Sequence, residues 1–101
     1  MNEYITEIAE IRVTDPQGFE AAVARARPYF LAAEGCLGLR LERVIEAPDT
    51  YRLVVDWQTL AHHTVTFRNS DGFQTWRSLA APFFVEPPKV THVMHVALDA
   101  G

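Results

Sequence analysis

The sequence is poor in cysteine, in basic side chains and in long apolar runs, and each shortage argues against a class of protein. Cys36 is the single cysteine, so no disulfide can form within the chain, which fits a reducing compartment. The formal net charge of −4 argues against a nucleic-acid partner. No apolar run approaches the roughly 20 residues that cross a bilayer, and the start M-N-E-Y-I-T-E lacks the features of a signal peptide. We therefore expect a cytoplasmic protein with no nucleic-acid or membrane partner.

The apolar content that is present suffices for a core. Hydrophobic residues make up 49% of the 101 residues, so we expect residues 1–101 to form one domain. A domain of this size buries only about two thirds of its unfolded surface. Pairing of two subunits would bury more.

The first third of the chain predicts a strand followed by a helix. Residues 4–13 interleave isoleucine and valine with charged side chains, as a strand does. Asp15 as N-cap and Pro16 in the first turn predict a helix start. Pro28 predicts a kink or an early end, and Gly35 suits the C-terminal stop. One face of this helix carries Phe19, Val23, Ala26 and Phe30.

The remaining elements follow from alternation and turn signals. Residues 37–46 and 50–58 alternate on either side of A-P-D-T and predict an antiparallel hairpin. A short helix is expected over 59–68, and Ser70 can cap a second one that runs to about Ala81. Residues 90–98 are apolar on both faces, which predicts a strand in a sheet covered on both sides.

This order of elements is typical of one fold class. It predicts an α+β protein with the ferredoxin-like split βαβ topology, a four-stranded antiparallel sheet with helices on one face. Exposure of apolar side chains on the other face to water would cost roughly 25 cal/mol of free energy per Å² of apolar surface. We therefore expect a homodimer packed sheet to sheet.

Several motifs, taken in order, resemble those of the antibiotic biosynthesis monooxygenase (ABM) family of dimeric α+β barrel proteins. The resemblance covers nearly the whole chain, and it implies a homodimer with a cavity between the sheet and the short helices. The motifs are G-C-L-G-L-R-L-E-R (35–43), E-A-P-D-T-Y-R-L-V-V-D-W (46–57), H-T-V-T-F-R-N-S (63–70), F-Q-T-W-R (73–77), P-F-F (82–84) and P-K-V-T-H (88–92).

The resemblance also implies an activity. Many family members oxidise polycyclic phenols, anthrones or quinols with molecular oxygen and use no metal or organic cofactor; others degrade haem, isomerise a signalling sugar phosphate or have no assigned activity. Haem degraders carry an asparagine in the first strand, a tryptophan in the short helix and a histidine in the next helix. The corresponding places here offer Glu7 and Ala9, then Phe67, then Arg77 or its neighbours, which makes haem degradation a poor fit.

The histidines show no spacing typical of metal ligands, so we expect no metal. His62 and His63 diverge by about 100° on a helix, and His92 and His95 point to opposite faces of a strand.

Two of the four histidines are candidate bases. His63 shares a helical face with Leu60 and Phe67, so we expect it to line the interior and take a phenolic proton. The alternative is a structural histidine bonded to a carbonyl or water. His92, between Val90 and Met94, is the second candidate base; we expect His62 and His95 to face solvent.

Six of the eleven aromatic residues lie between residues 57 and 84, together with two arginines. They predict a flat apolar pocket for an aromatic ligand, with arginine at its mouth; the alternative is an ordinary aromatic core with solvated arginines. We predict that His63, Phe67, Trp76 and Phe83 line one pocket, with Arg68 or Arg77 at its mouth. The full set expected to contact substrate is Trp57, Phe67, Arg68, Phe73, Trp76, Arg77, Phe83 and Phe84.

Two functions stay open. The first is a cofactor-independent monooxygenase acting on a polycyclic phenol, anthrone or quinol-type substrate with molecular oxygen, which needs only a base and a dry pocket. The second is a non-catalytic small-molecule-binding or orphan dimer of the same fold.

Overall fold

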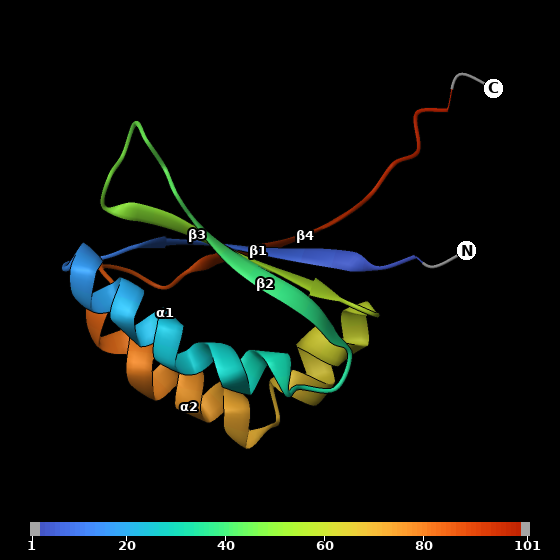
Figure 1. Ribbon diagram of the computed structural model, residues 1–101, viewed down its shortest axis with the longest axis horizontal. Coiled ribbons are helices and arrows are strands. Elements are labelled where there is room, and N and C mark those ends of the chain that lie inside the picture. Colours follow the sequence, from blue (N-terminus) through green and yellow to red (C-terminus); the bar gives the residue numbers. More distant parts are fainter. Residues whose placement is uncertain (1–2, 100–101) are drawn as a thin grey trace.

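One antiparallel sheet, covered on one face by helices, forms the body of the chain (Figure 1). The computed structural model describes residues 3–99, and the strand order is β2-β3-β1-β4. The predicted ferredoxin-like fold is confirmed. In the described part no helix is long and apolar enough to span a membrane. The elements are β1 (Ile5–Arg12), α1 (Pro16–Leu31), β2 (Cys36–Arg43), β3 (Thr50–Trp57), η1 (His62–Phe67), α2 (Asp71–Ala80), η2 (Ala81–Phe83) and β4 (Lys89–Met94).

The core lies between the sheet and the two long helices. Alternate residues of the central strands β1 and β3 point toward α1 and α2 and are buried, as the period of two requires. Large side chains fill the space between them, with Phe19 and Phe30 of α1 both touching Trp76 of α2. The predicted hairpin is confirmed, because β2 pairs antiparallel with β3.

Helix α1 begins where it is predicted, but it ends later. Asp15 occupies the N-cap position in an extended conformation, yet its side chain makes no capping hydrogen bond. Pro28 lies inside the helix, so the predicted early end is wrong. Pro28 and Ala24 are both exposed, so the carbonyl that loses its donor four residues back can bond to water.

Gly35 is not the C-terminal stop of α1, because the helix is capped at Ala32. Gly35 instead has a φ of +82° in the turn before β2. A side chain there would collide with the His62 ring. This glycine therefore lets η1 lie directly over the start of β2.

The last strand and the second face of the sheet differ most from expectation. β4 ends at Met94 rather than at residue 98, and residues 95–99 are exposed and irregular. The face away from the helices carries the ion pairs Arg52–Glu10 and Arg40–Glu42, at 3.8 and 2.9 Å. The predicted apolar second face is wrong at these positions, and the homodimer remains a prediction.

The two helices after β3 are positioned as expected but built differently. η1 has wide π-type turns, with the Arg68 amide bonded to the His63 carbonyl five residues back. Leu60 is 48% exposed, so its predicted inward position is wrong. Ser70 caps α2 as predicted, because its side chain accepts a hydrogen bond from the amide of Phe73.

Candidate functional site

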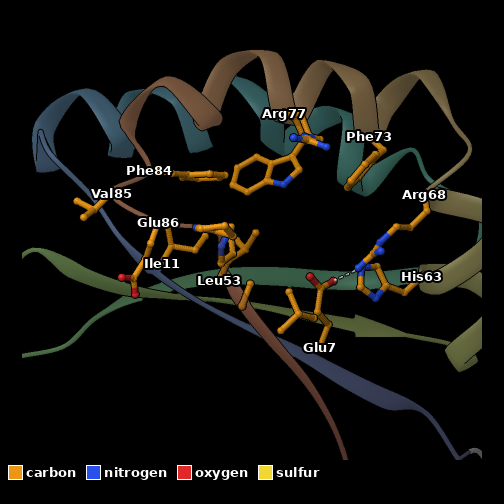
Figure 2. A pocket seen from close by; sticks show the side chains of 15 residues that line it. Glu7, Ile11, Leu53, His63, Arg68, Phe73, Arg77, Phe84, Val85 and Glu86 are labelled. Atoms are coloured by element: carbon orange, nitrogen blue, oxygen red, sulfur yellow. Dashed lines mark ion pairs between the residues drawn. The ribbon is translucent and has the colours of Figure 1, made fainter.

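A pocket of about 530 Å³ lies between α2 and the sheet. Figure 2 shows aromatic rings from α2 and the following segment on one side and strand side chains on the other. The sheet side is apolar, with Ala9, Ile11 and Leu53, except that it includes the carboxylate of Glu7. Residues 85–88 and Val90 complete the lining at the start of β4. The lining thus combines apolar and aromatic surfaces with a few charged or titratable side chains, which is typical of a small-molecule site.

Most residues that the sequence predicts for the site surround this pocket. His63 comes from η1, and Arg68 follows directly after it, while the α2 residues project from the helix that roofs the pocket. The predicted residues that line the pocket are His63, Arg68, Phe73, Trp76, Arg77 and Phe84.

Trp57 and Phe67 lie behind the pocket, in the core, so their prediction as lining residues is wrong. Trp57 has no exposed surface, and Phe67 is wedged between it and Phe30, with ring centroids 5.2 and 4.9 Å away. They support the site because they fix the η1 helix against the sheet.

Phe83 is also misplaced by the sequence prediction. A step of seven residues from Trp76 to Phe83 would keep both on one face only if the helix were continuous. α2 ends at Ala80, and the tighter η2 turn follows. As a result Phe83 packs against Gly18 of α1, and Phe84 takes the place in the pocket.

Glu7 is the functional residue that the sequence reasoning missed. Its side chain is 7% exposed, and its Oε1 accepts a hydrogen bond of 2.9 Å from the indole Nε1 of Trp57. Oε1 also lies 3.3 Å from Nε2 of His63. A signal was present, because Glu7 falls on the inward face of β1 between Ile5 and Ala9. A carboxylate at an apolar-face position costs folding free energy, so it marks a candidate site.

A second histidine extends this arrangement to the surface. Nδ1 of His63 lies 2.8 Å from Nε2 of His92, and His92 stands opposite Glu7 in the pairing of β1 with β4. The His63 ring is stacked on Trp57 at 5.5 Å, so it can rotate little. Both nitrogens of His63 are therefore engaged, one by a buried carboxylate and one by an exposed imidazole.

His62 does not face solvent as predicted. Its Nδ1 lies 2.8 Å from the Thr59 hydroxyl, and its Nε2 lies 3.4 Å from Glu34. The ring packs on Gly35, and its side chain is only 18% exposed. His95 is exposed, as expected. Hence the adjacent histidines have separate roles, His62 at the turn before β2 and His63 at the pocket.

Burial controls the protonation of Glu7, His63 and His92. Desolvation raises the pKa of Glu7 to about 7, although the Trp57 hydrogen bond and the charge of Arg68 oppose this rise. Desolvation lowers the pKa of His63 to about 4, with the charges of His92 and Arg68 acting in the same direction. The pKa of His92 is lowered by burial and by Arg68. Near neutral pH the carboxyl of Glu7 is thus the group that exchanges a proton most readily.

Comparison with known proteins places the chain in a family. The model of the antibiotic biosynthesis monooxygenase (ABM) family matches residues 4–79. This chain belongs to that family. The predicted resemblance is confirmed.

Relatives of this ABM protein include one with a solved structure and high identity. A Bordetella bronchiseptica protein assigned to the same monooxygenases is 50% identical, with a TM-score of 0.91 over 94% of this chain and 99% of its own. YczJ of Bacillus subtilis, an uncharacterised protein, is 35% identical over 80 residues, which are 79% of this chain and 84% of YczJ. SnoaB of Streptomyces nogalater, a cofactor-independent oxygenase, is 17% identical with a TM-score of 0.75 over 97% and 96% of the two chains. This last likeness shows the fold alone.

The side chains of Glu7, His63 and His92 in this ABM protein form a line of contacts rather than a cluster around one point. In residues 3–99 no cluster of three or more His, Cys, Asp or Glu side chains is suited to a metal ion. His63 turns a different nitrogen to Glu7 and to His92, so the three side chains do not converge on one point. The absence of a metal in the protein stays a prediction.

The two oxygens of the Glu7 carboxylate have different surroundings. The recorded contacts of its carboxylate use Oε1. Among the described residues no side-chain oxygen or nitrogen is both fully enclosed and without a partner. Oε2 therefore opens to the pocket, where it can accept a proton from a bound molecule.

Proposed function

We propose that this ABM protein is a cofactor-independent monooxygenase that oxidises a phenol, anthrone or quinol-type aromatic with molecular oxygen. The observation that carries the proposal is the carboxylate of Glu7 at the floor of an aromatic pocket, with one oxygen held by Trp57 and His63 and the other free. Such a substrate is rich in electrons and reacts with oxygen once it has lost a proton. The protein then has to supply a base, a place for the ring system and shelter from water.

The reaction balances without an additional oxidant. Oε2 of Glu7 removes a proton from the substrate, which becomes a carbanion or phenolate. This anion transfers an electron to molecular oxygen, and the two radicals combine to form a C–O bond. The peroxide takes the proton back from Glu7. Loss of water, with the hydrogen that remains on the carbon bonded to the peroxide, then gives a carbonyl, so that one O₂ yields one oxidised product and one water.

Glu7 takes the role of base that the sequence suggested for His63. A base works best when its pKa lies near the working pH, and the pKa of Glu7 is about 7 whereas that of His63 is about 4. His63 is better suited to orient the carboxylate, and His92 to hold the His63 ring. Arg68, whose charge acts on all three groups, can stabilise the negative charge that develops on the substrate oxygen.

The aromatic side chains select the kind of substrate. Phe73 and Phe84 face Ile11 and Leu53 across the pocket, which Trp76 also lines, so a planar ring system can lie between helix and sheet. The same surfaces exclude water from the carbanion.

Oxygen uptake with a panel of anthrones and hydroquinones, with no metal or flavin added, tests this function. We expect at least one compound to be oxidised with one O₂ consumed per product. A panel in which compounds bind in the pocket but none consumes oxygen above the uncatalysed rate would contradict the proposal, and would instead support a non-catalytic ligand-binding protein.

A further inference from the structure

Two arginines line the pocket without a carboxylate partner. Among the described residues neither Arg68 nor Arg77 makes an ion pair, whereas the four arginines of the strands each have one: Arg12 with Asp49, Arg40 with Glu42, Arg43 with Glu20 and Arg52 with Glu10. The chain as a whole is acidic, with a net charge of −4. Positive charge at the pocket is therefore a local feature, which would attract an anionic ligand.

The acidic residues of the pocket do not neutralise these arginines. Glu7 has a pKa of about 7, so it carries only part of a negative charge at neutral pH. Glu86 lies at the far end of the pocket from Arg68, as Figure 2 shows. In the same view Arg68 and Arg77 flank Phe73. The guanidinium of Arg68 lies over this ring, 5.9 Å from its centroid, which orients its N–H groups without satisfying them.

The two arginines lie at different distances from the base. The charge of Arg68 contributes to the pKa shifts of Glu7, His63 and His92, and that of Arg77 contributes to none of them. Arg68 therefore lies nearer to these groups than Arg77 does, as Figure 2 shows for Glu7 and His63. Arg77, one helical turn after Phe73 on α2, lines another part of the pocket.

We infer that the ligand of this pocket is an aromatic acid, a planar ring system whose carboxylate is bound by Arg77 while its ionising oxygen or carbon lies between Arg68 and Glu7. A guanidinium matches a carboxylate with two parallel hydrogen bonds, which fixes the orientation of the ring. The carboxylate would thus select which carbon of the ring system faces Oε2. This inference deepens the proposed function, because it names the substrate class of the same pocket.

Calorimetric titration with a matched pair of ligands tests it without any turnover. Anthracene-2-carboxylate and anthracene-2-carboxamide have nearly the same shape and differ in charge. We expect the acid to bind roughly 10–100-fold more tightly, the range given by hydrogen bonds to a charged group. Arg77→Gln should remove this preference, and Arg25→Gln, an exposed arginine of α1, should leave it unchanged.

Equal affinity of the wild type for the two compounds, or no binding of the acid, would overturn the inference, as would a preference that survives Arg77→Gln. Because binding is measured in the absence of reaction, these results do not depend on whether the protein is an oxygenase. Conversely, failure of oxygen uptake would leave a measured preference for the acid intact.

Discussion

The burial of Glu7 weakens folding when its carboxyl is ionised. Its pKa rises from an ordinary value of 4.5 to about 7 because it is buried. The folded state thus binds this proton more tightly than the unfolded chain. This tighter binding of the proton contributes to the free energy of unfolding. The contribution is fully present below about pH 4.5, and it is lost as the pH rises through 7 and the buried carboxyl ionises. The shift corresponds to roughly 3 kcal/mol.

Replacement of this residue should therefore stabilise the protein at alkaline pH. The amide oxygen of Glu7→Gln can still accept from Trp57 and His63. We expect its free energy of unfolding in urea to exceed that of the wild type by about 1–3 kcal/mol at pH 8 and by little at pH 5. Glu10→Gln, on the exposed side of the same strand, is the control and should change little at either pH. A variant that is less stable than the wild type at pH 8 would contradict the account.

At the scale of residues, the sequence predicted what lines the pocket better than how the groups interact. The placement of Phe73 and Trp76 follows from their location on a helix that covers the sheet. The contact of His63 with His92 could not be predicted, because it depends on the register between β1 and β4. This register places His92 opposite Glu7, which lies 85 positions earlier in the sequence. Glu7 was visible in the alternation of β1 but was overlooked among the other charged residues.

Among the elements, η1 depends on a contact with the turn before β2. The His62 ring lies on Gly35, where no side chain fits, and the Gly35 carbonyl accepts a hydrogen bond of 2.7 Å from the amide of Gln58. This contact sets the position of η1, and η1 carries His63 to the pocket. A change in the turn before β2 should therefore shift η1 and with it the position of His63.

Gly35→Ala should destabilise the protein by at least about 2 kcal/mol, because it adds both a left-handed backbone penalty and a collision with His62. Thermal and urea unfolding measure this loss. His62→Ala in the same chain should recover part of it, since only the collision is relieved. Gly72→Ala is the matched control, because a side chain there meets no atom closer than 3.5 Å. A Gly35→Ala protein as stable as the wild type would refute this role.

The elements themselves were largely predictable, and their ends were not. Alternation and helical periodicity identified the strands and both long helices. β4 ends where its pairing with β1 stops, at Met94 opposite Ile5. The apolar pattern of residues 95–98 does not predict where this pairing stops. The wide turns of η1 likewise depend on tertiary contacts of His63 and Phe67 rather than on local preference.

At the scale of the whole molecule, residues 95–99 form an exposed segment with apolar side chains that contact little of the body. Figure 1 shows the segment after β4 extending away from the body. Val96 and Leu98 in this segment are 68% and 89% exposed, and Met94 at the end of β4 is 61% exposed. Exposed apolar side chains grouped on one segment indicate a contact surface. We expect this segment and the open face of the sheet to meet a second copy.

Sedimentation velocity at micromolar concentration should show a dimer. Val96→Asp should shift the protein toward the monomer, because it places a charge in the expected contact. Ile45→Asp, in the turn between β2 and β3, provides the control, since Ile45 is 89% exposed but lies outside this segment. A monomeric wild type would show that the homodimer prediction is wrong.

The central claim is that the Glu7 carboxylate removes the substrate proton, and turnover by Glu7→Gln tests it most directly. With a substrate identified by oxygen uptake, we expect kcat of Glu7→Gln to fall by about 10²–10⁴-fold, the usual contribution of a general base, while the affinity for ligand is retained. The wild-type rate should rise with pH through about 7, where Glu7 ionises, and the residual rate of the variant should lack this rise. A Glu7→Gln protein that keeps nearly the full rate, with the same pH dependence, would show that the base lies elsewhere.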